Sequence, residues 1–180
     1  MRKREWKVVD KMMKTTTTAS VRRPADRAAI RAELHATQAS FHALVKAISP
    51  ERWSQPWPGS AWTACEVMVH LTWALEQLPS EVASARRGRG MFNYPAWIAN
   101  PGSYWINRWS ARGQTPASVL RRYEAAIDAA LVSLNSVADD EWERGANFYG
   151  HGFYTIEGLF HTPAEHLDEH TAALAGDRAA

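Results

Sequence analysis

Four stretches of the chain repeat apolar residues every three or four positions, and this spacing constrains the fold more than any other feature. Apolar residues spaced in this way lie along one face of an α-helix. The pattern predicts helices over residues 25–48, 63–85, 116–138 and 155–175. No stretch alternates apolar and polar residues as a half-buried strand does, and no internal repeat occurs. The sequence therefore predicts an all-α protein.

Local signals indicate where the second and third helices begin. Thr63 and Glu66 form a T-x-x-E capping box, in which each side chain accepts a hydrogen bond from a free backbone N–H group. Thr115 suits the N-cap position, and Pro116 suits the first helical position, where the missing N–H of proline costs nothing. Within the second helix, Pro79 marks a position at which the helix could kink or end.

Another proline, Pro163, lies inside the last helical stretch. Residues 162–165 read T-P-A-E, which is a further capping box, and a proline within a helix removes a backbone hydrogen bond. The helix therefore either begins afresh at Pro163 or bends there, and we expect a kinked or broken helix.

Three connections contain most of the turn-forming and aromatic residues. Residues 50–61 are rich in Pro, Gly, Ser and Trp, and residues 141–154 form an aromatic, glycine-containing loop. Residues 88–114 are longer than a structureless connection in a compact domain usually is, so we expect a short helix near residues 104–111. Four helices with this long crossover between the second and the third predict a four-helix bundle.

The composition is that of an ordinary folded domain, since 46% of the 180 residues are apolar and 22% are charged. No apolar run is long enough to span a membrane, and the basic N-terminus lacks the apolar stretch of a secretory signal peptide. Cys65 is the single cysteine, which excludes an internal disulfide, and we expect it to be a small buried side chain. A cytoplasmic protein is expected.

Residues 1–24 are expected to be a disordered or extended basic segment, followed by a bundle domain over residues 25–180. The first segment carries a net charge of +6, whereas residues 25–180 carry −4. Because a duplex-binding domain usually places its positive charge on a folded face, this distribution argues against a nucleic-acid partner. Met13 is an alternative start to Met1, because the residues before it add little that a fold requires.

Three histidines are candidate metal ligands. His166 and His170 are four residues apart in the last helix, so both imidazoles lie on one face. His70 lies within the apolar stripe of the second helix, where a polar side chain normally needs a partner. Three imidazoles suit zinc, nickel, iron or another late divalent ion, and they leave a coordination position open for water or substrate. Three histidines that are merely packed remain the alternative.

The other histidines are weaker candidates. His161 is expected to face away from both His166 and His170 on the last helix. His35 and His42 share roughly one face of the first helix and could be either buried or exposed.

Two motifs resemble those of the DinB-like superfamily of metal-binding four-helix bundles. At the start of the second helix the family typically shows W-[ST]-x-x-E-[VL]-x-x-H-L, and residues 62–71 read W-T-A-C-E-V-M-V-H-L. The family also carries H-x-x-E-H or a similar pair in its last long helix, matched by residues 166–170. The resemblance covers about residues 25–175. It implies that His70, His166 and His170 hold nickel, zinc or iron at one end of the bundle.

The resemblance also implies a thiol-related chemistry, because better-known relatives include the mycothiol-dependent maleylpyruvate isomerase and the bacillithiol transferases. In such enzymes a metal makes a bound thiol or water nucleophilic at neutral pH. The expected function is a metal-dependent thiol S-transferase or hydrolase that acts on a small electrophile, with a low-molecular-weight thiol as candidate cofactor. Members of the family often pair as dimers, so the resemblance allows a homodimer.

Six residues of the loops are candidates for the wall of a substrate pocket: Trp57, Trp62, Tyr94, Asn147, Tyr149 and His151. The sequence assigns no catalytic residue. The alternative function is a non-catalytic helical bundle that binds a small ligand or a partner protein.

Overall fold

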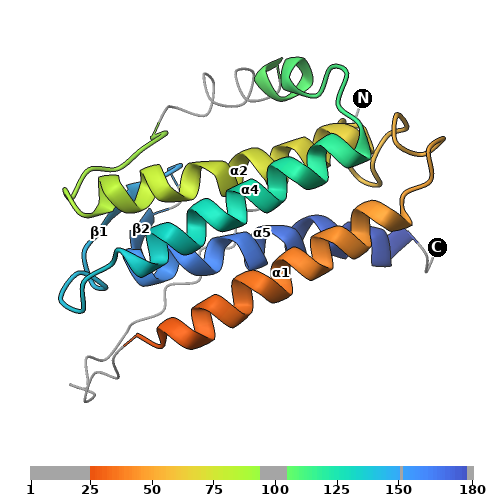
Figure 1. Cartoon of the computed structure of the whole chain (residues 1–180). Coiled ribbons are helices and arrows are strands. Elements are labelled where there is room, and N and C mark those ends of the chain that lie inside the picture. Colours follow the sequence, from red (N-terminus) through yellow and green to blue (C-terminus); the bar gives the residue numbers. More distant parts are fainter. Residues whose placement is uncertain (1–24, 94–104, 151, 178–180) are drawn as a thin grey trace.

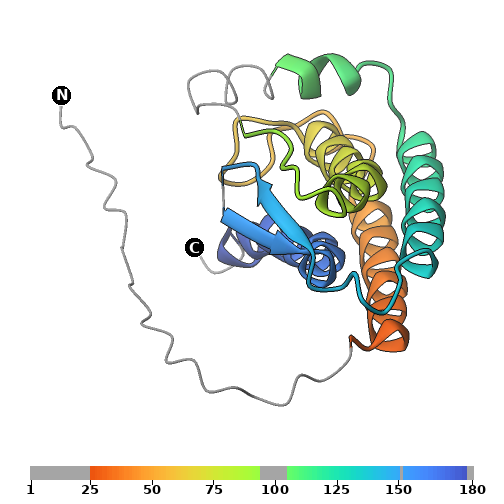
Figure 2. The same ribbon diagram turned by 90° about the vertical axis from the view of Figure 1, so that its left-hand side faces the viewer.

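The computed structural model describes residues 25–93, 105–150 and 152–177, so the N-terminal segment and its alternative start lie outside the described residues. Four long helices dominate this part (Figure 1). They are α1 (Arg27–Ala47), α2 (Ala64–Ala85), α4 (Pro116–Asn135) and α5 (Ile156–Asp177). α1 and α2 each pack against both α4 and α5, so the helices form a closed bundle in the order α1–α4–α2–α5 (Figures 1 and 2). The predicted all-α four-helix bundle is confirmed.

The helices begin at the predicted capping signals. The Thr63 hydroxyl accepts a hydrogen bond from the Glu66 N–H at 3.2 Å, and the Glu66 carboxylate accepts one from the Thr63 N–H at 2.7 Å. Thr115 caps α4, with Pro116 at the first helical position. α1 begins two residues later than predicted, because the Asp26 carboxylate caps it by accepting from the N–H groups of residues 28 and 29.

Neither internal proline ends its helix. α2 continues through Pro79 to Ala85, and α5 continues through Pro163. Of the two alternatives at Pro163, a helix that breaks and starts afresh is therefore wrong, whereas a kink at this proline stays a prediction. Proline deprives the Leu159 carbonyl of its usual N–H donor, and the Thr162 hydroxyl donates to that oxygen at 2.8 Å instead. Thr162 thus compensates for the proline within α5 rather than capping a new helix.

A two-stranded antiparallel hairpin precedes α5, where the sequence predicted only a loop. It consists of β1 (Gly145–Phe148) and β2 (Gly152–Thr155). Strands of four residues are too short to show an alternating pattern, which explains why this prediction was wrong. The strands approach closely at Gly145, where a Cβ atom would collide with the Tyr154 carbonyl oxygen. The hairpin links the bundle to the start of α5.

The crossover between α2 and α4 contains the expected short helix, over residues 105–110. The Asn107 side-chain amide donates to the Glu66 carbonyl oxygen at 2.8 Å. The Trp53 indole N–H donates to the Gln114 carbonyl oxygen at 3.0 Å. These bonds fasten the crossover and the loop before α2 to the first turn of that helix.

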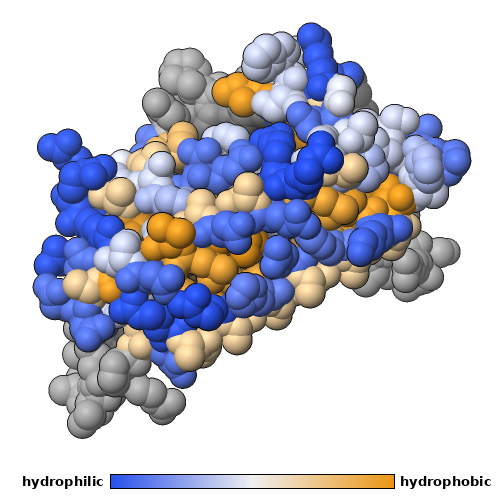
Figure 3. Space-filling view, in the orientation of Figure 1, coloured by the Kyte–Doolittle hydropathy of each residue, from blue (hydrophilic) through white to orange (hydrophobic). Residues whose placement is uncertain are grey.

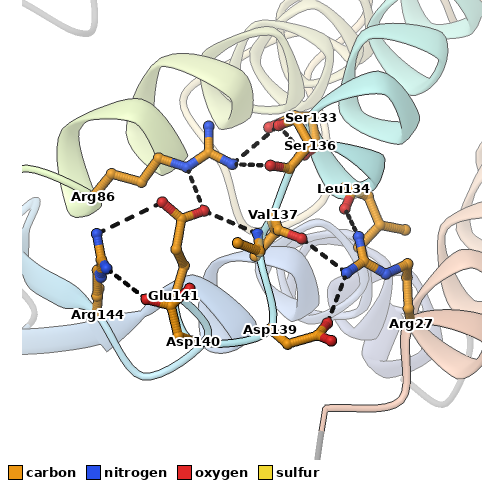
Figure 4. Close-up of polar contacts among 11 residues, drawn as sticks. Arg27, Arg86, Ser133, Leu134, Ser136, Val137, Asp139, Asp140, Glu141 and Arg144 are labelled. Atoms are coloured by element: carbon orange, nitrogen blue, oxygen red, sulfur yellow. Dashed lines mark hydrogen bonds and ion pairs between the residues drawn. The ribbon is translucent and has the colours of Figure 1, made fainter.

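An arginine–glutamate network fixes the turn between α4 and β1 (Figure 4). Arg27 of α1 donates to the Leu134 carbonyl oxygen at 2.6 Å, and Arg86 after α2 donates to the Glu141 carboxylate at 3.0 Å. Glu141 also accepts from the Ala138 N–H, and this bond together with the nearby arginines holds the pKa of its carboxyl below the ordinary value. The turn is thereby tied to three helices, which positions the hairpin and α5.

The interior of the bundle is apolar, and its outer surface is mixed. Phe41 of α1 and Tyr123 of α4 stack with their ring centroids 3.7 Å apart. The face on which α1 and α4 lie is largely hydrophilic, with scattered apolar patches (Figure 3). None of the helices in the described residues is both long enough and apolar enough to cross a membrane.

Glu81 of α2 is an exception within this interior. Its side chain is 3% exposed, and its Oε1 atom has no hydrogen-bond partner among the described residues. Burial raises the pKa of this carboxyl from 4.5 to about 7, because the charged form loses its hydration. Between these pH values the folded protein keeps a proton that the unfolded chain releases, so stability falls as the pH rises.

We expect Glu81→Gln to raise the free energy of unfolding by about 2 kcal/mol at pH 8, because a neutral amide avoids an ionised buried carboxyl. At pH 5, where the folded protein already holds a neutral carboxyl, the effect should be much smaller. Urea unfolding of the metal-free protein at both pH values measures the difference. Asp128→Asn, an exposed carboxylate on α4, is the matched control. Equal effects of Glu81→Gln at pH 5 and pH 8 would contradict this explanation.

Candidate metal centre

The three candidate histidines lie where α2 packs against α5. His70 is in the second turn of α2, whose start is set by the Thr63–Glu66 capping box. His166 and His170 lie one turn apart on α5. The two helices run side by side in opposite directions (Figure 1), so residues 96 positions apart in the sequence become neighbours.

The imidazoles of these histidines converge. The Nε2 atoms of His70 and His166 are 3.1 Å apart. The ring centroid of His170 lies 5.5 Å from that of His70 and 5.0 Å from that of His166. One nitrogen of each ring lies within 4.8 Å of the corresponding nitrogens of the other two. Within the described part of the chain, no other group of His, Cys, Asp and Glu side chains meets this geometry.

Burial keeps these imidazoles neutral. It lowers the pKa of His70 to about 3 and that of His166 to about 4, and repulsion from the neighbouring imidazoles adds to both shifts. Burial also lowers the pKa of His170, while the nearby Glu169 carboxylate works in the opposite direction. Neutral imidazole is the form that binds a metal, so none of the three side chains has to lose a positive charge at neutral pH before it coordinates one.

The donor set fits a late divalent ion. Nitrogen atoms bonded to one zinc ion at about 2.0–2.1 Å are about 3.3–3.4 Å apart in a tetrahedral site. The separation of 3.1 Å between His70 and His166 is close to this value, and the limit of 4.8 Å for the three nitrogens is wider. Three imidazoles could therefore hold a metal and leave a coordination position for a further ligand.

Two of the six predicted pocket residues lie beside the histidines. The buried Trp57 donates its indole N–H to the His170 carbonyl oxygen at 3.2 Å, which ties the loop before α2 to α5. Trp57 also donates its backbone N–H to the Trp62 carbonyl oxygen at 2.7 Å. The Trp62 ring lies 4.8 Å from the His70 ring, between centroids. The loop before α2 therefore places the Trp62 ring against His70 and ties the Trp57 ring to the backbone of His170.

The other predicted pocket residues are not shown beside the histidines. Asn147 is exposed on β1, and Tyr149 lies in the turn of the hairpin, where its ring stacks on Phe92. Tyr94 and His151 lie outside the described residues.

The remaining histidines are elsewhere. His161 Nδ1 lies 2.8 Å from the Glu33 carboxylate of α1, so this side chain faces away from the site as expected. His42 Nε2 lies 3.4 Å from the Glu124 carboxylate, between α1 and α4, and His35 is exposed.

A separate cavity of about 320 Å³ adjoins the first turn of α2. Its lining includes Cys65 and Glu66 but none of the three histidines. The Cys65 sulfur lies 3.6 Å from the Ala111 carbonyl oxygen, and burial raises the pKa of the thiol to about 11. A thiol that stays protonated is a poor nucleophile, so Cys65 is a packed side chain, as predicted.

Two aromatic residues, Trp73 and Phe92, are not among the predicted pocket residues. Trp73 follows His70 by three residues on α2, and its ring contacts that of Phe92 at a centroid distance of 5.6 Å. The helical spacing between His70 and Trp73 was a visible signal. The contact of Phe92 with Tyr149 joins distant segments, so no local pattern could have indicated it.

Comparison with known proteins agrees with this architecture. Two solved structures, of the mycothiol-dependent maleylpyruvate isomerase and of a mutant of it, match with TM-scores of 0.67 and 0.66 at 10% and 9% sequence identity. Both matches cover 83% of this chain and 60% of the other, so the chain spans about three fifths of the length of those proteins. No curated protein matches. The family model of the DinB superfamily matches residues 33–174, and the chain therefore belongs to the DinB superfamily.

Proposed function

We propose that this protein is a metal-dependent enzyme that transfers a thiol to a small electrophile or hydrolyses such a compound. His70, His166 and His170 are the proposed ligands of a nickel, zinc or iron ion. The observation that carries the proposal is the convergence of three largely buried, neutral imidazoles from two helices.

The residues around the site suit such chemistry. When bound, a divalent ion lowers the pKa of a thiol or water and so supplies a nucleophile at neutral pH. The imidazoles need no deprotonation to bind it, because burial already keeps them neutral. Trp57 and Trp62 limit the access of water on the side of the loop before α2. These features favour a nucleophile that reacts with a bound molecule in preference to bulk solvent.

The substrate class and the thiol are further parts of the proposal. A likeness to a mycothiol-dependent isomerase supports a low-molecular-weight thiol as the second reactant, with a small molecule as substrate. A cytoplasmic location and pairing as a homodimer remain predictions from the sequence and the resemblance.

Metal analysis tests the ligand set. We expect purified wild-type protein to carry about one equivalent of metal, and His170→Ala to carry less than a tenth of that, because two imidazoles bind a divalent ion far more weakly than three. A free metal concentration of about 100 times Kd should add about 2.7 kcal/mol to the stability, or about 5–10 °C in Tm. His35→Ala, on the exposed side of α1, is the control. A metal-free wild type whose Tm is unaffected by nickel and zinc would favour the non-catalytic bundle.

The pH dependence of stability tests the burial of the ligands. Unfolded imidazoles take up protons below about pH 6.5, whereas folded His70 and His166 stay neutral until the pH approaches 4. The metal-free protein should therefore lose up to about 2 kcal/mol per histidine between pH 7.5 and pH 5. Urea unfolding in the presence of a chelator measures this loss, and His166→Gln should reduce it. An equal loss of stability in the wild type and in His166→Gln would contradict the lowered pKa of His166.

Turnover tests the reaction class. We expect metal-loaded protein with mycothiol or cysteine to accelerate the consumption of 1-chloro-2,4-dinitrobenzene if it is a transferase, and p-nitrophenyl acetate if it is a hydrolase. A metal-dependent rate at least about 100-fold above the uncatalysed rate, lost in His170→Ala, would support the proposal. Stable metal binding without turnover of either probe would instead indicate a ligand-binding bundle.

A further inference from the structure

Three aromatic side chains, Trp73, Phe92 and Tyr149, form an aromatic stack that begins on α2 three residues after His70. The ring centroids of Trp73 and Phe92 are 5.6 Å apart at an interplanar angle of 64°, and those of Phe92 and Tyr149 are 5.4 Å apart at 8°. Because Trp73 lies three residues after His70 on α2, these two side chains are neighbours on the helix surface. All three residues are half-buried, so part of the surface of the stack is accessible.

Two members of the aromatic stack have left-handed backbone conformations. The φ angle is 58° at Phe92 and 57° at Tyr149, values that are rare for bulky side chains. Tyr149 is followed in the hairpin turn by Gly150, with φ 72°, and left-handed positions such as these favour glycine, asparagine or aspartate. The backbone of the turn therefore does not explain why an aromatic residue is present.

Hydrogen bonds between the segment after α2 and the hairpin hold these conformations in place. The Tyr149 N–H donates to the Met91 carbonyl oxygen at 3.1 Å. The Asn93 side chain donates to the Asn147 carbonyl oxygen at 2.7 Å and accepts from the Gly150 N–H at 3.0 Å. Figure 2 shows the hairpin beside this segment. Strained residues that are held so firmly by their surroundings are typical of ligand sites.

We propose that the aromatic stack is the specificity wall of the histidine site, and that the site takes a molecule with a flat aromatic or conjugated group. This inference rests on the proposed function, because the polar end of the molecule is taken to reach a metal held by the histidines. Trp62 lies on the N-terminal side of His70 and Trp73 on its C-terminal side, so aromatic residues precede and follow His70 along the chain. Aromatic side chains bind a planar apolar group by stacking and by excluding water.

A pair of hydroxamates tests the inference by equilibrium binding. Benzohydroxamate and acetohydroxamate bind zinc through the same group and differ in the aromatic ring. Calorimetric titration of the zinc-loaded full chain should show benzohydroxamate binding at least about tenfold more tightly. Tyr149→Asn should reduce this ratio to below about threefold while leaving the acetohydroxamate affinity within about twofold. Its Tm should not fall, because asparagine tolerates the left-handed conformation better than tyrosine does.

Two further variants complete the experiment. Trp73→Leu should reduce the ratio in the same way without altering the hairpin turn. Phe153→Ala removes an exposed ring of β2 outside the aromatic stack and should leave the ratio unchanged. A wild-type ratio near one, or the same ratio in wild type and both stack variants, would overturn the inference and leave the metal site standing. If neither hydroxamate binds the zinc-treated protein, the inference and the proposed function both fail.

Discussion

The contact between α2 and α5 is the interaction on which the candidate site depends. It brings three imidazoles together in an interior from which most water is removed, and the loss of water keeps them neutral. The capping box at Thr63 sets the position of His70 along one helix, and the hydrogen bond from Trp57 ties the other helix to the loop before α2. The arginine–glutamate network beyond α4 fixes the point from which the hairpin and α5 start.

The parts of this structure that could be predicted from the sequence have local causes. A capping box and a helical stripe lie within a few residues of each other, so the starts of α2 and α4 could be assigned. The spacing of His166 and His170 likewise places both on one face of α5. The side of the bundle that His70 faces depends on packing between distant segments, and periodicity alone cannot supply it. Only the resemblance to the family predicted that His70 faces the two histidines of the last helix.

The features that could not be predicted arise from competition between local signals and their surroundings. Residues 162–165 have the sequence of a helix start, yet the Thr162 hydroxyl compensates for Pro163 and lets α5 continue. The hairpin strands are too short to show a pattern. Tyr149 has a left-handed backbone, which bulky residues rarely adopt, and contacts made by the folded chain hold it there. The first of these departures lies one turn before His166 on α5, next to the candidate site, where a chain is expected to depart from local preference.

The separation of His70 and His166 along the chain has a consequence for folding kinetics. These residues are 96 positions apart, and in the helix order α1–α4–α2–α5 they meet only when the final helix docks. Contacts of such long range form late, because the entropy of closing the loop must be lost before the contact is gained. An ion bound by both residues would therefore stabilise the bundle only after the last helix has docked. It would lengthen the lifetime of the folded state while leaving the rate of folding nearly unchanged.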